Sequence, residues 1–101
     1  MKHYFYKLIS PRPTFPADMT PEEGRLMQSH VAYWAGHMAI GRVIALGPVA
    51  DPKGTFGVGI IRLDDDTDPA SLGAGDPVIQ ANAGFAFEMH PMPRVLVPEK
   101  P

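Results

Sequence analysis

A chain of 101 residues with 45% hydrophobic residues can bury one core but not two, so we expect a single domain over residues 1–101. The net charge of −2 and the scattered Lys and Arg residues argue against a nucleic-acid partner. The absence of cysteine excludes disulfides and thiolate chemistry, and no apolar run approaches the roughly 18 residues of a membrane span. We therefore expect a cytoplasmic protein with no membrane partner, and so small a core favours a homodimer.

The first predicted element is a strand over residues 2–9. Tyr4, Tyr6 and Leu8 alternate with Phe5 and Ile9, which predicts a strand covered on both faces. Residues 10–19 contain three prolines and are expected to form an irregular loop that ends at Met19.

A helix is predicted to begin after Thr20. Thr20 is a good N-cap, Pro21 suits the first helical position, and Glu23 can close a capping box. The helix should end near Gly41. One broad apolar stripe is expected to face a sheet, and it comprises Leu26, Met27, His30, Val31, Tyr33, Trp34, His37 and Met38.

Two strands that form a hairpin are predicted next, over residues 42–49 and 55–63. The intervening sequence Asp-Pro-Lys-Gly at 51–54 is typical of a turn. Gly57 and Gly59 leave part of one face of the second strand without side chains, which often marks the close approach of a ligand or of another backbone.

The last third of the chain predicts helical turns followed by a strand. Asp68-Pro69 can cap a short second helix, and Asp76-Pro77 repeats the signal for residues 78–82. A strand is expected over 84–90, then a proline-rich tail over 91–101 with an edge strand at 95–97. The order βαββαβ predicts an α+β fold, the ferredoxin-like sandwich.

His30 is the first candidate for chemistry. It lies on the flank of the apolar stripe between Met27 and Trp34, so its imidazole should be partly desolvated and able to titrate near neutrality. The alternative interpretation is a histidine at the edge of the core, hydrogen-bonded to a carbonyl group.

Asp76 is the second candidate, because an aspartate can hold an imidazole in one tautomer or stabilise its charged form. Nothing in the spacing joins it to His30. An aspartate that only caps a helix before proline is the alternative, and the two roles are compatible.

No metal or cofactor is expected. His37 lies seven residues after His30, a rise of about 10.5 Å, which one ion cannot bridge. The aspartates at 64, 65, 66 and 68 lack the spacing of a calcium loop, and the Gly-Val-Gly sequence at 57–59 lacks the third glycine of a dinucleotide loop.

Four segments together resemble YCII-related proteins over nearly the whole chain. They are the sequences His-Val-Ala-Tyr-Trp at 30–34, Gly-Arg-Val-Ile-Ala-Leu-Gly-Pro-Val-Ala-Asp at 41–51, Gly-Asp-Pro-Val at 75–78 and His-Pro-Met at 90–92. The resemblance implies a ferredoxin-like fold whose sheets pair into a dimeric α/β barrel, with an active site built on His30 and Asp76.

The resemblance also implies a class of chemistry. One member of the family is a dehydrochlorinase acting on a chlorinated hydroxyquinol, and relatives in the superfamily include muconolactone isomerases and small monooxygenases. Two departures are the longer loop at 10–19, which can cover a pocket, and the stretch 67–75, which lacks the usual alanine-rich and glutamate-rich helix.

The first functional hypothesis is a cofactor-independent lyase or isomerase for a small aromatic or lactone-type substrate. His30 would act as general acid/base and Asp76 would orient it. The expected pocket residues are Tyr33, Trp34, His37, Pro48, Gly57 and Gly59. The alternative is a homodimer that binds a small metabolite, or serves as an accessory subunit, without catalysis. A haem-using or quinone-oxidising relative rests on fold analogy alone.

Overall fold

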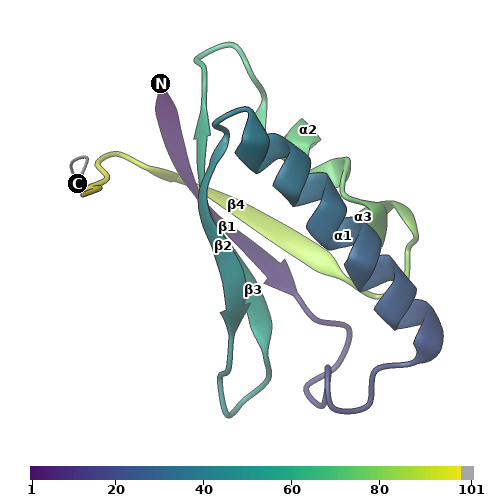
Figure 1. The fold of residues 1–101 in the computed structure, drawn as a ribbon. Coiled ribbons are helices and arrows are strands. Elements are labelled where there is room, and N and C mark those ends of the chain that lie inside the picture. Colours follow the sequence, from purple (N-terminus) through teal and green to yellow (C-terminus); the bar gives the residue numbers. More distant parts are fainter. Residues whose placement is uncertain (99–101) are drawn as a thin grey trace.

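A computed structural model describes residues 1–98 of the chain (Figure 1). The elements in chain order are β1 (Lys2–Ile9), α1 (Pro21–Ala39), β2 (Val43–Val49), β3 (Phe56–Leu63), α2 (Pro69–Ala74), α3 (Pro77–Gln80) and β4 (Ala86–Met92). Over these residues, no helix combines the length and the apolar character that crossing a bilayer requires.

The four strands form one antiparallel sheet in the order β2-β3-β1-β4. All three helices lie on one face of it, with α1 along its length (Figure 1). This order and layering are those of the ferredoxin-like fold, so the predicted fold class is confirmed.

Helix α1 begins as its sequence predicts. The hydroxyl of Thr20 accepts a hydrogen bond from the backbone N–H of Glu23 at 3.1 Å, and the carboxylate of Glu23 accepts one from the backbone N–H of Thr20 at 3.0 Å. The helix ends at Ala39, and Gly41 adopts a φ of +83°, a conformation that glycine allows without strain.

The apolar stripe of α1 is narrower than predicted. Trp34 and His30 are buried, but Val31 is 58% exposed and Met38 is 43% exposed. Val31 lies about 100° around the helix from His30, and Met38 lies equally far from His37, so both fall outside the line along which α1 meets the sheet. The broad stripe was therefore wrong at these two positions.

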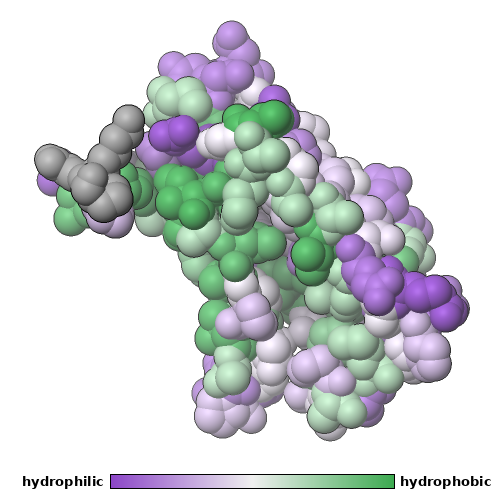
Figure 2. All heavy atoms as spheres, in the orientation of Figure 1, coloured by the Kyte–Doolittle hydropathy of each residue, from purple (hydrophilic) through white to green (hydrophobic). Residues whose placement is uncertain are grey.

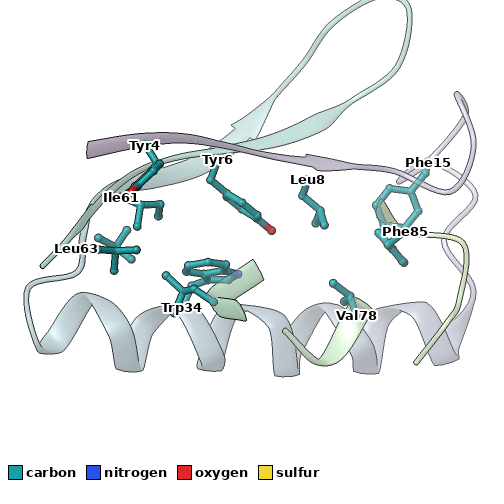
Figure 3. Close-up of a cluster of buried hydrophobic side chains, with 11 residues drawn as sticks. Tyr4, Tyr6, Leu8, Phe15, Trp34, Ile61, Leu63, Val78 and Phe85 are labelled. Carbon is teal, nitrogen blue, oxygen red and sulfur yellow. The ribbon is translucent and has the colours of Figure 1, made fainter. Parts of the chain in front are cut away.

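The core fills the space between the sheet and the helices (Figure 3). Aromatic and aliphatic side chains from β1 and β3 pack on Trp34 and Val78, while Phe15 meets Phe85 edge to face at 5.4 Å. The buried core side chains are Tyr4, Tyr6, Leu8, Phe15, Trp34, Val43, Ile61, Leu63, Leu72, Val78 and Phe85.

The opposite face of the sheet is not covered by any described element, so the prediction that β1 is covered on both sides was wrong for this chain alone. Phe5 and Ile9 on that face are half-buried. We call this surface the open face, and by strand register it includes Phe5, Lys7, Ile9, Phe56, Val58, Ile60, Arg62, Glu88 and His90.

The two helical segments of the C-terminal third are confirmed as α2 and α3, which begin at the predicted caps Asp68 and Asp76. The segment after them differs from its prediction at two points. Strand β4 begins at Ala86, after Gly84 turns the chain with a φ of +93°, and extends to Met92, which pairs with His3. Residues 95–97 form no strand, and 99–101 lie outside the described residues.

Candidate active site

Asp76 is placed by the start of α3. Its side-chain Oδ1 accepts a hydrogen bond from the backbone N–H of Val78 at 3.0 Å, so it is the helix cap that the sequence predicts. The residue is also completely buried. A buried carboxylate is costly unless it is paired and hydrogen-bonded, so its remaining partners decide what it does.

Those partners come from one face of α1. The Nδ1 of His30 lies 2.5 Å from Oδ2 of Asp76, and the indole N–H of Trp34 donates to the same oxygen at 2.7 Å. Trp34 follows His30 by four residues, so both side chains lie on the same side of the helix. The structure thus brings together two residues that are 46 positions apart in the chain.

These contacts set the charge of the pair. Burial raises the pKa of Asp76, but hydrogen bonds from His30, the Val78 backbone and Trp34 outweigh it and bring the pKa below its usual range. An ionised carboxylate only accepts hydrogen bonds, so the proton of a neutral His30 resides on Nδ1. Its Nε2 then carries a lone pair, and Nε2 has no hydrogen-bond partner within residues 1–98.

Tyr6 completes the surroundings of the pair. Its ring reaches from β1 toward Trp34, with the ring centroids 4.6 Å apart (Figure 3). Its hydroxyl is buried and has no hydrogen-bond partner in the described part of the chain. Burial, and then the negative charge of Asp76, raise the pKa of Tyr6, so the phenol stays protonated.

A cavity of about 400 Å³ opens beside His30. It lies between the β2–β3 hairpin, the N-terminal half of α1 and the loop at 10–19, where the surface is hollowed (Figure 2). Its walls are mostly apolar, and they comprise Tyr6, Leu8, Ser10, Phe15, Pro16, Met19, Met27, His30, Val31, Leu46, Gly47, Pro48, Thr55, Phe56, Gly57 and Val58. A cavity of this size suits a small ligand.

The predicted site residues divide into two groups. His30, Pro48 and Gly57 line the cavity, whereas Asp76, which lies behind His30, and four others do not. Trp34 lies in the core and holds Asp76, so a substrate in the cavity would not lie against it. At Gly59 the space that a Cβ would need is filled by Leu46, 2.8 Å away.

Tyr33 and His37, the other two, lie elsewhere on α1. The hydroxyl of Tyr33 donates to the backbone carbonyl of Leu72 at 2.6 Å, and its ring meets His37 edge to face at 4.7 Å. Burial, and then the charge of Arg42, lower the pKa of His37. Both residues therefore pack within the helix layer and do not line the cavity.

One wall of the cavity comes from the loop at 10–19, which the sequence analysis expected to cover a pocket without naming the residues that would do so. Its residues Phe15 and Met19 line the cavity. The loop is fixed to the start of α1 by Arg12, whose guanidinium donates to both carboxylate oxygens of Glu23 at 2.7 Å. That ion pair, together with the capping bonds from Thr20, lowers the pKa of Glu23 to about 2. No hydrophobic periodicity marks this loop, and its only signal was its length.

A second histidine–carboxylate pair lies on the open face. Nε2 of His90 is 2.9 Å from the carboxylate of Glu88, and the two side chains are 58% and 45% exposed. No group of three His, Asp or Glu side chains within the described residues is arranged to hold a metal ion.

Comparison with protein-family models matches residues 4–93 to the model described as the YCII-related domain. The match includes both His30 and Asp76. A comparison with curated proteins found no match.

Proposed function

The chain belongs to the YCII-related domain family, and we propose that it is a small-molecule enzyme in which His30 and Asp76 perform general acid/base chemistry. The reaction class is an elimination or an isomerisation of a small aromatic or lactone-type substrate. Such a reaction moves a proton off one substrate atom and returns it elsewhere or releases it with a leaving group, so it requires no cofactor.

The observation that carries the proposal is the arrangement of one imidazole between a buried carboxylate and a cavity. Nδ1 of His30 faces Asp76 at 2.5 Å, and the same residue lines the cavity. Nε2 is therefore the ring atom available to accept a substrate proton. Asp76 fixes the tautomer and stabilises the imidazolium that forms, and a positioned base of this kind contributes roughly 10² to 10⁴ in rate.

A non-catalytic binding module is the second candidate, and one observation favours it. Among the residues that line the cavity, His30 is the only Asp, Glu, His, Lys or Arg side chain. A reaction that needs a separate acid and base would therefore have to use His30 for both steps. In a binding module, His30 would only hydrogen-bond the ligand, and Asp76 would only cap α3.

We also propose that the protein acts in the cytoplasm as a homodimer joined through the apolar part of the open face on β1 and β3, which leaves the Glu88–His90 pair on the edge strand β4 in contact with solvent. The apolar side chains of Phe5, Val58 and Ile60 on that face support this, because no described element of the chain covers them. Analytical ultracentrifugation should give twice the mass of the chain, and Ile60→Glu should reduce it. A monomer at micromolar concentration would contradict the dimer.

The experiment that separates the two functions is a screen of small aromatic compounds and lactones with two readouts. Thermal shift reports binding, and chromatography of the same mixtures reports product. An enzyme yields product that His30→Gln abolishes while His90→Gln, at the same oligomeric state, does not. Thermal shifts without product, or product formation unchanged in His30→Gln, would overturn the catalytic proposal.

A further inference from the structure

The cavity carries no compensating charge for an ionic ligand. None of the sixteen residues in its walls is Lys, Arg, Asp or Glu. Two nearby cations are engaged elsewhere, because Arg12 pairs with Asp18 and Glu23, and the ammonium of Lys7 lies 4.6 Å from the ring centre of Phe56. An ion transferred into such walls would lose its hydration without gaining a partner.

The polar groups in the walls are few and mostly committed. The hydroxyl of Ser10 donates to the backbone carbonyl of Thr55 at 2.6 Å, and this bond joins the loop to the start of β3. The hydroxyl of Tyr6 is covered from solvent. His30 therefore provides the main polar contact, and the carboxylate of Asp76 behind it makes the approach of an anion still less favourable.

The remaining wall surface suits a flat ring. It is formed by the aromatic ring of Phe15 and by the thioethers of Met19 and Met27. Such polarisable groups pack well against aromatic compounds. About 400 Å³ lies at the small end of ligand pockets, which corresponds to one or two fused rings.

We infer that the cavity binds an uncharged one- or two-ring compound with a single hydrogen-bonding group at Nε2 of His30, and that it discriminates against the corresponding anion. The inference rests on the proposed function for the site that it describes, but it concerns binding alone. The inference narrows the class of candidate substrates, because it excludes ring compounds that carry a carboxylate or a phosphate.

The test compares 2-naphthamide with 2-naphthoate, which have nearly the same shape and differ in charge. Dissociation constants are measured by calorimetry at mildly alkaline pH, where an ordinary imidazole is neutral. We expect the amide to bind at least about tenfold more tightly. Equal binding, tighter binding of the carboxylate, or failure of both compounds to bind at millimolar concentration would overturn the inference.

A matched pair of variants at the edge of the cavity checks that charge is the cause. Val31 lines the cavity and is 58% exposed, so a longer side chain fits there without disturbing the core. Val31→Lys adds a cation beside His30, and it should reduce the preference for the amide by about threefold or more. Val31→Gln adds length without charge and should leave the preference as in the wild type; a similar change in both variants would overturn the charge argument.

The outcomes distinguish this inference from the catalytic proposal. Selective binding of the amide, with no product formed from any neutral ring compound, would retain the inference and contradict catalysis. Turnover of a neutral substrate that His30→Gln abolishes, together with equal binding of amide and carboxylate, would retain catalysis and contradict the inference.

Discussion

Two histidine–carboxylate pairs within residues 1–98 have the same chemical groups and very different surroundings. The side chains of His30 and Asp76 are 8% and 0% exposed, whereas those of His90 and Glu88 are 58% and 45% exposed. Asp76 has two further donors, Trp34 and the Val78 backbone, and His30 lines a cavity. Burial and supporting hydrogen bonds therefore make one pair a candidate site and leave the other a solvated surface contact.

The largest expected difference comes from removing each carboxylate. Asp76→Ala leaves the side chains of His30 and Trp34 and the N–H of Val78 without their acceptor, so the free energy of unfolding should fall by roughly 3–5 kcal/mol. Glu88→Ala removes an exposed partner, and its midpoint in urea should match the wild type. Urea unfolding followed by tryptophan fluorescence measures the free energy of unfolding of both variants. Equal losses of free energy in the two variants would contradict the distinction between a buried and an exposed pair.

A smaller effect is expected from Trp34→Phe, which keeps an aromatic ring and removes one donor to Asp76. The free energy of unfolding should fall by roughly 2 kcal/mol, since hydrogen bonds to charged groups contribute about 1.5–3 kcal/mol. Urea unfolding followed by circular dichroism measures this change. Tyr33→Phe, whose lost partner is a neutral carbonyl, is the matched control and should cost less than Trp34→Phe.

The pH dependence of stability should also separate the pairs. The pKa of Asp76 in the folded protein lies below its ordinary value of 3.8. The stability that ionised Asp76 gives to the folded protein is therefore complete above pH 3.8 and is lost as the pH falls through the folded pKa. Glu88 shifts in the same direction, because of the hydrogen bond from His90. The two responses should differ in their sensitivity to salt.

Salt screens the exposed pair much more than the buried one. The melting temperature is measured from neutral to acidic pH. The slope of melting temperature against pH should decrease in Asp76→Asn at both low and high salt. In Glu88→Gln the slope should change at low salt only. Identical salt sensitivity of the two variants would show that the His30–Asp76 pair is as solvated as the surface pair.

The smallest effect is expected from Tyr6→Phe. The substitution removes a buried hydroxyl that has no hydrogen-bond partner in the described structure, so the free energy of unfolding should change by less than about 1 kcal/mol. The same urea titration measures it. A loss as large as that of Trp34→Phe would mean that the hydroxyl bonds to Asp76 in solution.

Local signals in the sequence predicted the local structure well. Thr20, Glu23 and Asp76 cap their helices as predicted, because capping depends on residues two or three positions apart. The alternation of side chains along residues 2–9 likewise predicted β1, and the turn sequence at 51–54 predicted the hairpin of β2 and β3. The limits of β4 were missed because pairing with His3 extends the strand, an effect that the segment alone does not encode.

The site was predictable only in part. The spacing of His30 and Asp76 does not join them, and their pairing was expected from the family resemblance alone. The role of Trp34 had a usable signal, because a donor four residues after His30 lies on the same side of the helix. The wall formed by Phe15 and Met19 had no such signal, since a loop without periodicity is placed by tertiary contacts such as that of Arg12 with Glu23.

The role of His30 as a base can be tested by observing the tautomer of each histidine by ¹⁵N–¹H NMR above the pH at which the rings titrate. We predict that His30 carries its proton on Nδ1, hydrogen-bonded to Asp76, and leaves Nε2 free to accept a proton, whereas exposed His90 shows no such fixed Nδ1–H form. A proton on Nε2 of His30, or the same mixture of tautomers in both residues, would contradict the assignment of His30 as a base facing the cavity.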